Sequence, residues 1–181
     1  MHKELAGTAS SHNRVLYFQR LIEKTNNTVD PELILILYKT YWNTFLKNMK
    51  LKKGALEMLK ELKKRDIKTA IVSDLTTHIQ LRKMKQLKIS RYFDYLVTSE
   101  EAGSEKPHSI MFLLALNKLN LLPREAIMVG DNSVTDIEGA NAVGLDTVLI
   151  KKKFLTRTKG DYRKPDYKIK HLKEVLKIIH A

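Results

Sequence analysis

The 181-residue sequence contains no cysteine, which excludes a disulfide framework and a thiolate metal site. It also lacks any apolar run that approaches the roughly 20 residues needed to cross a membrane. The first fourteen residues, MHKELAGTASSHNR, lack the apolar centre of a signal peptide. The default expectation is therefore a cytoplasmic protein with no membrane partner.

Acidic residues are scarce relative to basic ones: 33 lysines and arginines against 20 aspartates and glutamates give a net charge of +13. A basic balance of this size can indicate nucleic-acid binding through phosphate contacts. Here the lysines are scattered along amphipathic patterns, and aromatic residues are not interleaved with them as a base-stacking surface requires. We therefore interpret the charge mainly as solvated helix faces, which also attract small phosphorylated anions, and nucleic acid is the less favoured partner.

The first 50 residues predict helices and no strand. Apolar residues recur at helical spacing over 11–24 and 30–47, and Asp30-Pro31 supplies an N-cap followed by proline at the first helical position. Six residues of the second helix are expected to form one apolar stripe: Leu33, Ile36, Leu37, Tyr41, Phe45 and Leu46.

After residue 50 the pattern changes to an alternation of helices and strands. Helices are expected over 54–66, 76–89, 106–121 and 133–144, and a last one from His171. Short apolar runs predict strands over 67–74, 92–99, 125–131 and 145–152, with a brief extended segment at 166–170. Such alternation is typical of an α/β fold with a parallel sheet covered by helices on both faces. The chain thus divides into a helical part, 1–50, and an α/β core, 51–181.

Polar side chains cluster where three of the predicted strands end. Ser73-Asp74 closes one strand, Lys106 follows the next, and Asp131 and Asp136 follow the third. Any one of these groups alone could be a helix cap or a residue that precedes a helix. Together they supply a hydroxyl, an ammonium and carboxylates to the edge where ligands bind in parallel sheets. Carboxylate oxygens suit Mg²⁺, and the set is suited to phosphoryl transfer.

Three segments resemble motifs II, III and IV of the haloacid dehalogenase-like (HAD) hydrolases: IVSD, GSEKPHSIMF and VGDNSVTDIEGANAVGLDTVLI. The resemblance implies a Rossmann-like fold in which Ser73 contacts the phosphoryl oxygen and Lys106 steadies nucleophile and phosphate. It further implies that Asp131 ligates Mg²⁺ with help from Asp136, and that residues 1–50 form part of a helical cap. Asp74 stands where many relatives carry a neutral residue, and it adds a carboxylate beside the substrate-binding groups.

The family's nucleophile belongs to an Asp-x-Asp motif at the end of a central strand, and no Asp-x-Asp occurs in this sequence. The resemblance implies that this strand lies between the strands that end in Ser73 and Asp131, so we expect a gap in the sheet with unpaired backbone groups on both sides. Three interpretations remain: the sequence is a fragment, a separate or second chain supplies the strand, or the sheet closes up in an inactive relic.

Three functions follow as hypotheses. The first is a Mg²⁺-dependent phosphatase that acts on a small phosphorylated metabolite through an aspartyl-phosphate, once the nucleophile is present. Haloacid dehalogenation is the alternative chemistry within the family, and an inactive binding module is the alternative for the chain alone. His12 and Trp42 are interpreted as a helix-start residue and a packing residue.

Overall fold

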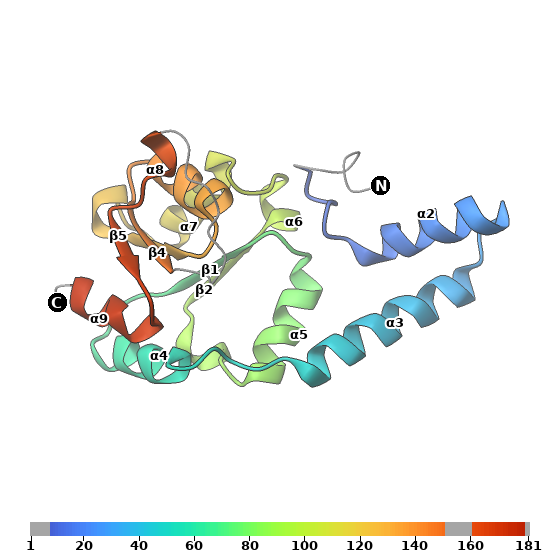
Figure 1. Ribbon diagram of the computed structural model, residues 1–181, viewed down its shortest axis with the longest axis horizontal. Helices are drawn as coiled ribbons and strands as arrows, with labels where there is room; N and C mark the ends of the chain where they lie inside the picture. The colour runs from blue at the N-terminus through green and yellow to red at the C-terminus, as the bar shows by residue number, and fades with distance from the viewer. Residues whose placement is uncertain (1–7, 151–160, 180–181) are drawn as a thin grey trace.

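The computed structural model describes residues 8–150 and 161–179, and helices alternate with strands along most of that length (Figure 1). The α-helices are α2 (Arg14–Asn26), α3 (Pro31–Asn48), α4 (Ala55–Lys64), α5 (Thr77–Leu87), α6 (Ser99–Ala102), α7 (Ser109–Leu119), α8 (Gly139–Asn141) and α9 (Val175–Ile178). The strands are β1 (Ala70–Ser73), β2 (Tyr95–Thr98), β3 (Ile127–Gly130), β4 (Asp146–Ile150) and β5 (Tyr167–Ile169). Each predicted strand is present, and residues 151 and 152 of the fourth lie outside the described residues.

Helices α2 and α3 lie side by side and extend away from the strands as a helical hairpin (Figure 1). Their ends follow the capping residues in the sequence. The side chain of Asn13 accepts a hydrogen bond from the backbone N–H of Val15, and Asp30 Oδ1 accepts one from Leu33 N at 2.9 Å. The prediction of two helices in this region is confirmed, since a capped start and an apolar face favour helix at both.

The packing of α3 differs from the predicted single stripe. Trp42 is buried against Leu75 and Ile79, which confirms its packing role. Ile36, by contrast, is 60% exposed, and Phe45 is exposed as well. The predicted stripe is only partly buried, because α2 and α5 make the main contacts with α3 and cover only part of its circumference.

The strands form two parallel sheets. β1 pairs with β2, in a register that places Ser73 opposite Thr98. β4 lies between β3 and β5, and pairs with β3 so that Gly130 lies opposite Leu149. The α/β class with parallel strands is confirmed, because helices follow the strands along the chain and pack beside them.

An apolar cleft separates the two sheets. β1 and β3 are not paired with each other in the described structure, and residues from both line one cavity of about 680 Å³. Its walls include Ile71 and Val72 of β1, Ile127 and Met128 of β3, and Phe112 of α7. The expected gap in the sheet is therefore present as a space bounded by two strand edges.

The segment after β3 is wound differently from the expected single α-helix. Residues Ser133–Glu138 form a π-helix, η3, and the α-helical hydrogen-bond pattern starts only at α8. The Asn132 carbonyl accepts hydrogen bonds from both Asp136 N and Ile137 N, while its side chain caps Val134 N and Thr135 N. This wider turn brings Asp136 back toward the start of the segment. π-turns of this kind are frequent at functional sites.

The last described helix is α9, which follows the short 3-10 helix η5 (Leu172–Glu174) and packs on α4. Val175 of α9 joins Val148 and Ile169 in a buried cluster under the second sheet. Within the described residues, no helix combines the length and apolar character needed to cross a membrane.

Candidate functional site

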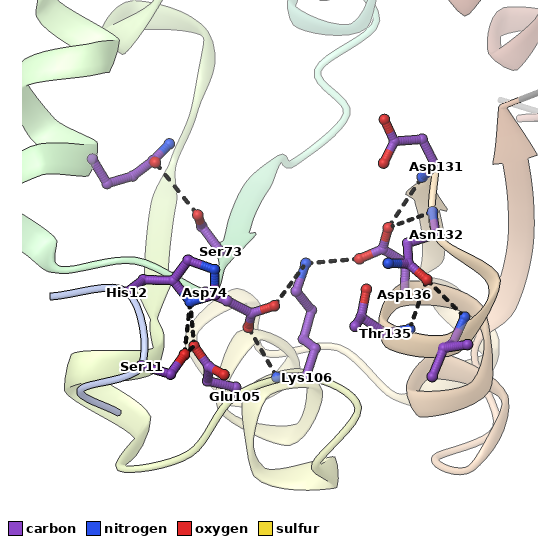
Figure 2. A network of polar contacts seen from close by, with 12 residues as sticks. Ser11, His12, Ser73, Asp74, Glu105, Lys106, Asp131, Asn132, Thr135 and Asp136 are labelled. Carbon is purple, nitrogen blue, oxygen red and sulfur yellow. Dashed lines mark hydrogen bonds and ion pairs between the residues drawn. The ribbon is translucent and has the colours of Figure 1, made fainter. Parts of the chain in front are cut away.

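Four of the predicted site residues gather at the carboxyl ends of β1 and β3, where Figure 2 shows them in one network of contacts. Asp74 follows the last residue of β1, and Asp131 follows the last residue of β3. Lys106 comes from the loop between α6 and α7, and Asp136 from the π-helix. Because β1 and β3 border the same cleft and both end at its polar side, the fold brings together residues more than 60 positions apart.

Lys106 is the centre of this network. Its Nζ lies 2.7 Å from Asp136 Oδ1 and 4.0 Å from Asp74 Oδ2. The side chains of Lys106 and Asp136 are only 10% and 9% exposed. The backbone N–H of Lys106 also donates to Asp74 Oδ1 at 2.9 Å. Two largely buried carboxylates on one ammonium fix its position, since each charged group would be costly to leave unpaired.

Asp136 also fixes the loop that carries Asp131. Its Oδ2 accepts hydrogen bonds from Asp131 N at 3.0 Å and from Asn132 N at 3.1 Å. Gly130 makes this approach feasible, because a Cβ built there would lie 2.3 Å from the Asp136 Cβ. The close contact of backbone and carboxylate therefore requires glycine at this position.

Asp131 is the more open of the two carboxylates in this loop. Its side chain is 32% exposed, and Oδ2 lies 3.2 Å from Nζ of Lys52. Lys52 lies in the connection between α3 and α4, and it was not among the predicted site residues. Sequence reasoning missed it because Lys52-Lys53 has the appearance of the solvated lysines found all along this chain.

The polar residues surround a cavity of about 250 Å³ that joins the apolar cleft at its carboxyl end. Lys52, Lys106, Asp131 and Asp136 line it. The two cavities share four lining residues: Val72, Met128, Val129 and Leu172. Both amines and both carboxylates therefore face the end of the gap between β1 and β3.

Ser73 lies apart from this ion-pair network. Its hydroxyl is 3.4 Å from Gln80 Oε1 of α5, and Ser73 does not line the smaller cavity. Its role as a contact of a phosphoryl oxygen stays a prediction. The same holds for the metal role of Asp131 and Asp136, because within the described residues no group of three or more metal-ligating side chains is present.

Two residues ahead of α2 reach the opposite side of the network. The Ser11 hydroxyl donates to Glu105 Oε1, and Nδ1 of His12 contacts the same oxygen (Figure 2). Thr8 forms an antiparallel bridge with Ser104 beside them. His12 is therefore not merely a residue before a helix. No short motif links positions 12 and 105, so the sequence alone offered no signal for this contact.

Burial raises the pKa of Asp74, and the Lys106 ammonium and backbone N–H partly offset that effect. A carboxyl whose folded-state pKa is raised favours folding below its ordinary pKa of 3.8, and it loses that contribution as pH rises through the folded pKa. We predict that Asp74→Asn stabilises the chain at pH 7 by about 0.5 kcal/mol in urea denaturation. The gain should disappear below about pH 4.

Asp94 provides a control of opposite sign. A hydrogen bond from the Thr69 backbone N–H lowers its pKa, so its charged form favours folding at pH 7 and loses that effect as pH falls through the folded pKa. Asp94→Asn should therefore destabilise the chain at pH 7. Stabilisation by both variants, or a gain for Asp74→Asn that persists at pH 3, would contradict the burial argument.

Sequence comparison finds curated relatives over most of the chain. The ribulose-1,5-bisphosphate 5-phosphatase of Halopiger xanaduensis is 46% identical over 147 residues, which are 81% of this chain and 62% of that protein. The chain therefore spans less than two thirds of this relative. The glyceraldehyde 3-phosphate phosphatase of Pyrococcus furiosus is 31% identical over 164 residues, or 90% of this chain and 68% of that protein.

Comparison with solved structures finds the same fold in enzymes of different names. A HAD phosphatase from Thermococcus onnurineus superposes with a TM-score of 0.64 at 24% identity, covering 90% of this chain and 88% of that one. A 2-haloacid dehalogenase from Pseudomonas syringae gives 0.68 at 18% identity, covering 91% and 79%. At these identities the likeness concerns the fold alone.

A match to a family sequence profile identifies the family of this chain. The profile of the haloacid dehalogenase-like hydrolases covers residues 3–150, a range that contains all the residues of the ion-pair network. The match agrees with the resemblance of the three motifs and with the parallel strands that carry them. This chain belongs to the haloacid dehalogenase-like hydrolase family.

Proposed function

We propose that the chain forms the larger part of a Mg²⁺-dependent phosphatase that acts on a small phosphorylated metabolite. The observation that carries this proposal is the polar cavity at the end of the apolar cleft, where Lys52, Lys106, Asp131 and Asp136 meet. Two ammonium groups suit a phosphoryl anion, and the carboxylates suit a divalent cation beside it.

The relatives support a phosphatase over a dehalogenase. The fold occurs in proteins of both names, so it does not separate the two chemistries. The curated relatives at 46% and 31% identity both have names of phosphatases with small phosphorylated substrates. Since the chain spans 62% of the first, its activity and substrate class are carried over as proposals.

The proposed roles of Lys106, Asp131 and Asp136 follow from exposure and contacts, and that of Ser73 rests on the resemblance of its motif. Lys106 neutralises the phosphoryl group, Ser73 donates to one of its oxygens, and Asp74 lies beside the bound substrate. Asp131 is the better placed metal ligand, because its carboxylate is partly exposed at the cavity, while both oxygens of Asp136 already accept hydrogen bonds. Asp136 therefore holds the metal site in place.

Magnesium fits this donor set. It commonly binds through one or two carboxylates, keeps several waters and takes the remaining ligands from phosphate oxygens. Asp131 supplies one hard oxygen ligand at the cavity, with Asp136 behind it. When bound, the ion would neutralise charge on the phosphoryl group.

We assign the nucleophile to a strand that occupies the apolar cleft in the complete catalytic unit. A parallel strand there would pair with both β1 and β3, and its carboxyl end would reach the polar cavity. An aspartate at that end would attack phosphorus, the bond from phosphorus to the leaving oxygen would break, and that oxygen would take a proton. Water would then hydrolyse the aspartyl-phosphate and release inorganic phosphate.

The same cleft defines the proposed partner and the proposed domains. The strand can come from the rest of a longer protein, from a separate chain or from a second copy, and each would cover the unpaired edges. We assign the helical hairpin, within residues 1–50, to a cap and residues 51–181 to the core.

The test joins an apolar strand that ends in Asp-x-Asp to the amino end of the chain. We expect hydrolysis of glyceraldehyde 3-phosphate or ribulose 1,5-bisphosphate by this extended chain with Mg²⁺, and none after chelation. Asp131→Ala should lower the rate by about 100-fold or more. The rate of hydrolysis is measured by the release of inorganic phosphate.

Asp146→Ala is the matched control, because Asp146 is an exposed aspartate at the opposite, amino end of β4. The Asp146→Ala variant should keep nearly the full rate of hydrolysis. Turnover that does not depend on metal would overturn the proposal. Hydrolysis by the 181-residue chain alone would overturn the assignment of the nucleophile to an added strand.

A further inference from the structure

Lys52 and Lys106 line the same small cavity but are held in different ways. Lys106 is buried and lies 2.7 Å from Asp136. Lys52 is 61% exposed, and its one ion pair in the described structure is with Asp131 at 3.2 Å. The first ammonium is therefore fixed, whereas the second sits on a flexible stem in contact with water.

Three aspartates and two lysines meet at this site. Asp74, Asp131 and Asp136 carry three negative charges, and Lys52 and Lys106 carry two positive ones. The Lys106 ammonium already lies close to two of these carboxylates, those of Asp74 and Asp136. Asp131 contacts Lys52, whose ammonium lies 3.2 Å from Oδ2, an oxygen that a cation could also bind.

We propose that Lys52 is a movable counter-ion: it neutralises Asp131 in the metal-free site and passes to an anionic oxygen of the substrate when the metal binds. This inference rests on the proposed function, in that Asp131 must take a divalent cation. A divalent ion at Asp131 would repel the Lys52 ammonium, and the phosphoryl group that enters the same cavity would attract it.

Exposure explains why Lys52 moves and Lys106 stays. Exposed ion pairs contribute little to stability, because water screens them and the side chains lose freedom. Breaking the Lys52–Asp131 pair therefore costs little, and a divalent ion can replace it. Breaking the Lys106–Asp136 pair would leave a buried carboxylate without its partner, which is costly.

The proposal predicts opposite effects of one substitution on two ligands. Lys52→Met keeps most of the stem and removes the charge. We expect Mg²⁺ to bind about three- to tenfold more tightly, because it no longer competes with an ammonium. We expect inorganic phosphate, titrated with Mg²⁺ at saturation, to bind about three- to tenfold more weakly, because one cation of its site is missing.

Calorimetric titration of the purified 181-residue chain measures both affinities without any need for turnover. Lys52→Arg keeps the charge and should change each affinity by less than about twofold. Lys53→Met removes the same charge one residue away, from a side chain that lines neither cavity, and should also change them by less than about twofold. A thermal melt of each variant checks that it is folded.

The outcomes separate this inference from the proposed function. If the wild-type chain binds Mg²⁺ and Lys52→Met binds it equally or more weakly, the counter-ion role is overturned and the metal site stands. If phosphate affinity does not fall in Lys52→Met, the transfer to substrate is overturned. If the wild-type chain binds no Mg²⁺, this inference fails, whereas the proposed metal dependence is decided by chelation of the extended chain.

Discussion

Lys106→Met is expected to lower the free energy of unfolding by about 3 kcal/mol, a large share of the stability of a domain of this size. The substitution removes the ammonium that Asp136 and Asp74 share, and both carboxylates are largely buried. A buried charge that loses its partner carries the full cost of desolvation. The loss should be measured by urea denaturation at pH 7.

Lys63→Met is the matched control, because Lys63 forms an exposed pair with Asp94 at 3.6 Å. Loss of this ion pair should lower the free energy of unfolding by less than about 1 kcal/mol. Equal losses in the two variants at pH 7 would show that the Lys106 network contributes no more than an exposed ion pair.

Gly130→Ala is expected to cost about 3 kcal/mol and to disturb the site directly. The new Cβ would lie 2.3 Å from Cβ and 2.5 Å from Oδ2 of Asp136, so that side chain must move. Its movement would break the hydrogen bonds from Asp131 N and Asn132 N and the contact with Lys106. Urea denaturation and Mg²⁺ titration of the same variant measure the two effects.

Gly103→Ala separates this clash from the general effect of replacing a glycine. A Cβ at Gly103 would meet no atom within 4 Å, although its φ of +75° strains any side chain. Its cost should be about 1 kcal/mol, with Mg²⁺ affinity unchanged. If Gly130→Ala lowers the free energy of unfolding no more than Gly103→Ala does, the close approach of Gly130 to Asp136 contributes nothing to stability.

Much of the fold can be predicted because local signals agree with the final structure. The N-cap at Asp30 and the short apolar runs ahead of Ser73 and Asp131 place a helix and two strands correctly. The π-turn after Asn132 could not be predicted, since it depends on hydrogen bonds between the loop and Asp136. The exposure of Ile36 also escaped prediction, because apolar spacing does not say which faces of a helix have neighbours.

The candidate site divides in a similar way. Lys106, Asp131 and Asp136 follow predicted strands and match a family pattern, so their proximity can be predicted from the sequence alone. Lys52 and Glu105 lie in connections, and their contacts with Asp131 and His12 arise only from tertiary packing. Such residues carry no periodic signal, since their spacing along the chain is set by the fold.

The helical hairpin meets the core at two segments, one ahead of α2 and one between α3 and α4, and each contacts the polar network of the site. The first presents Ser11 and His12 to Glu105, next to Lys106, and the second presents Lys52 to Asp131. The two ends of the hairpin therefore meet the same polar network, so the position of the hairpin and the geometry of the site depend on one another.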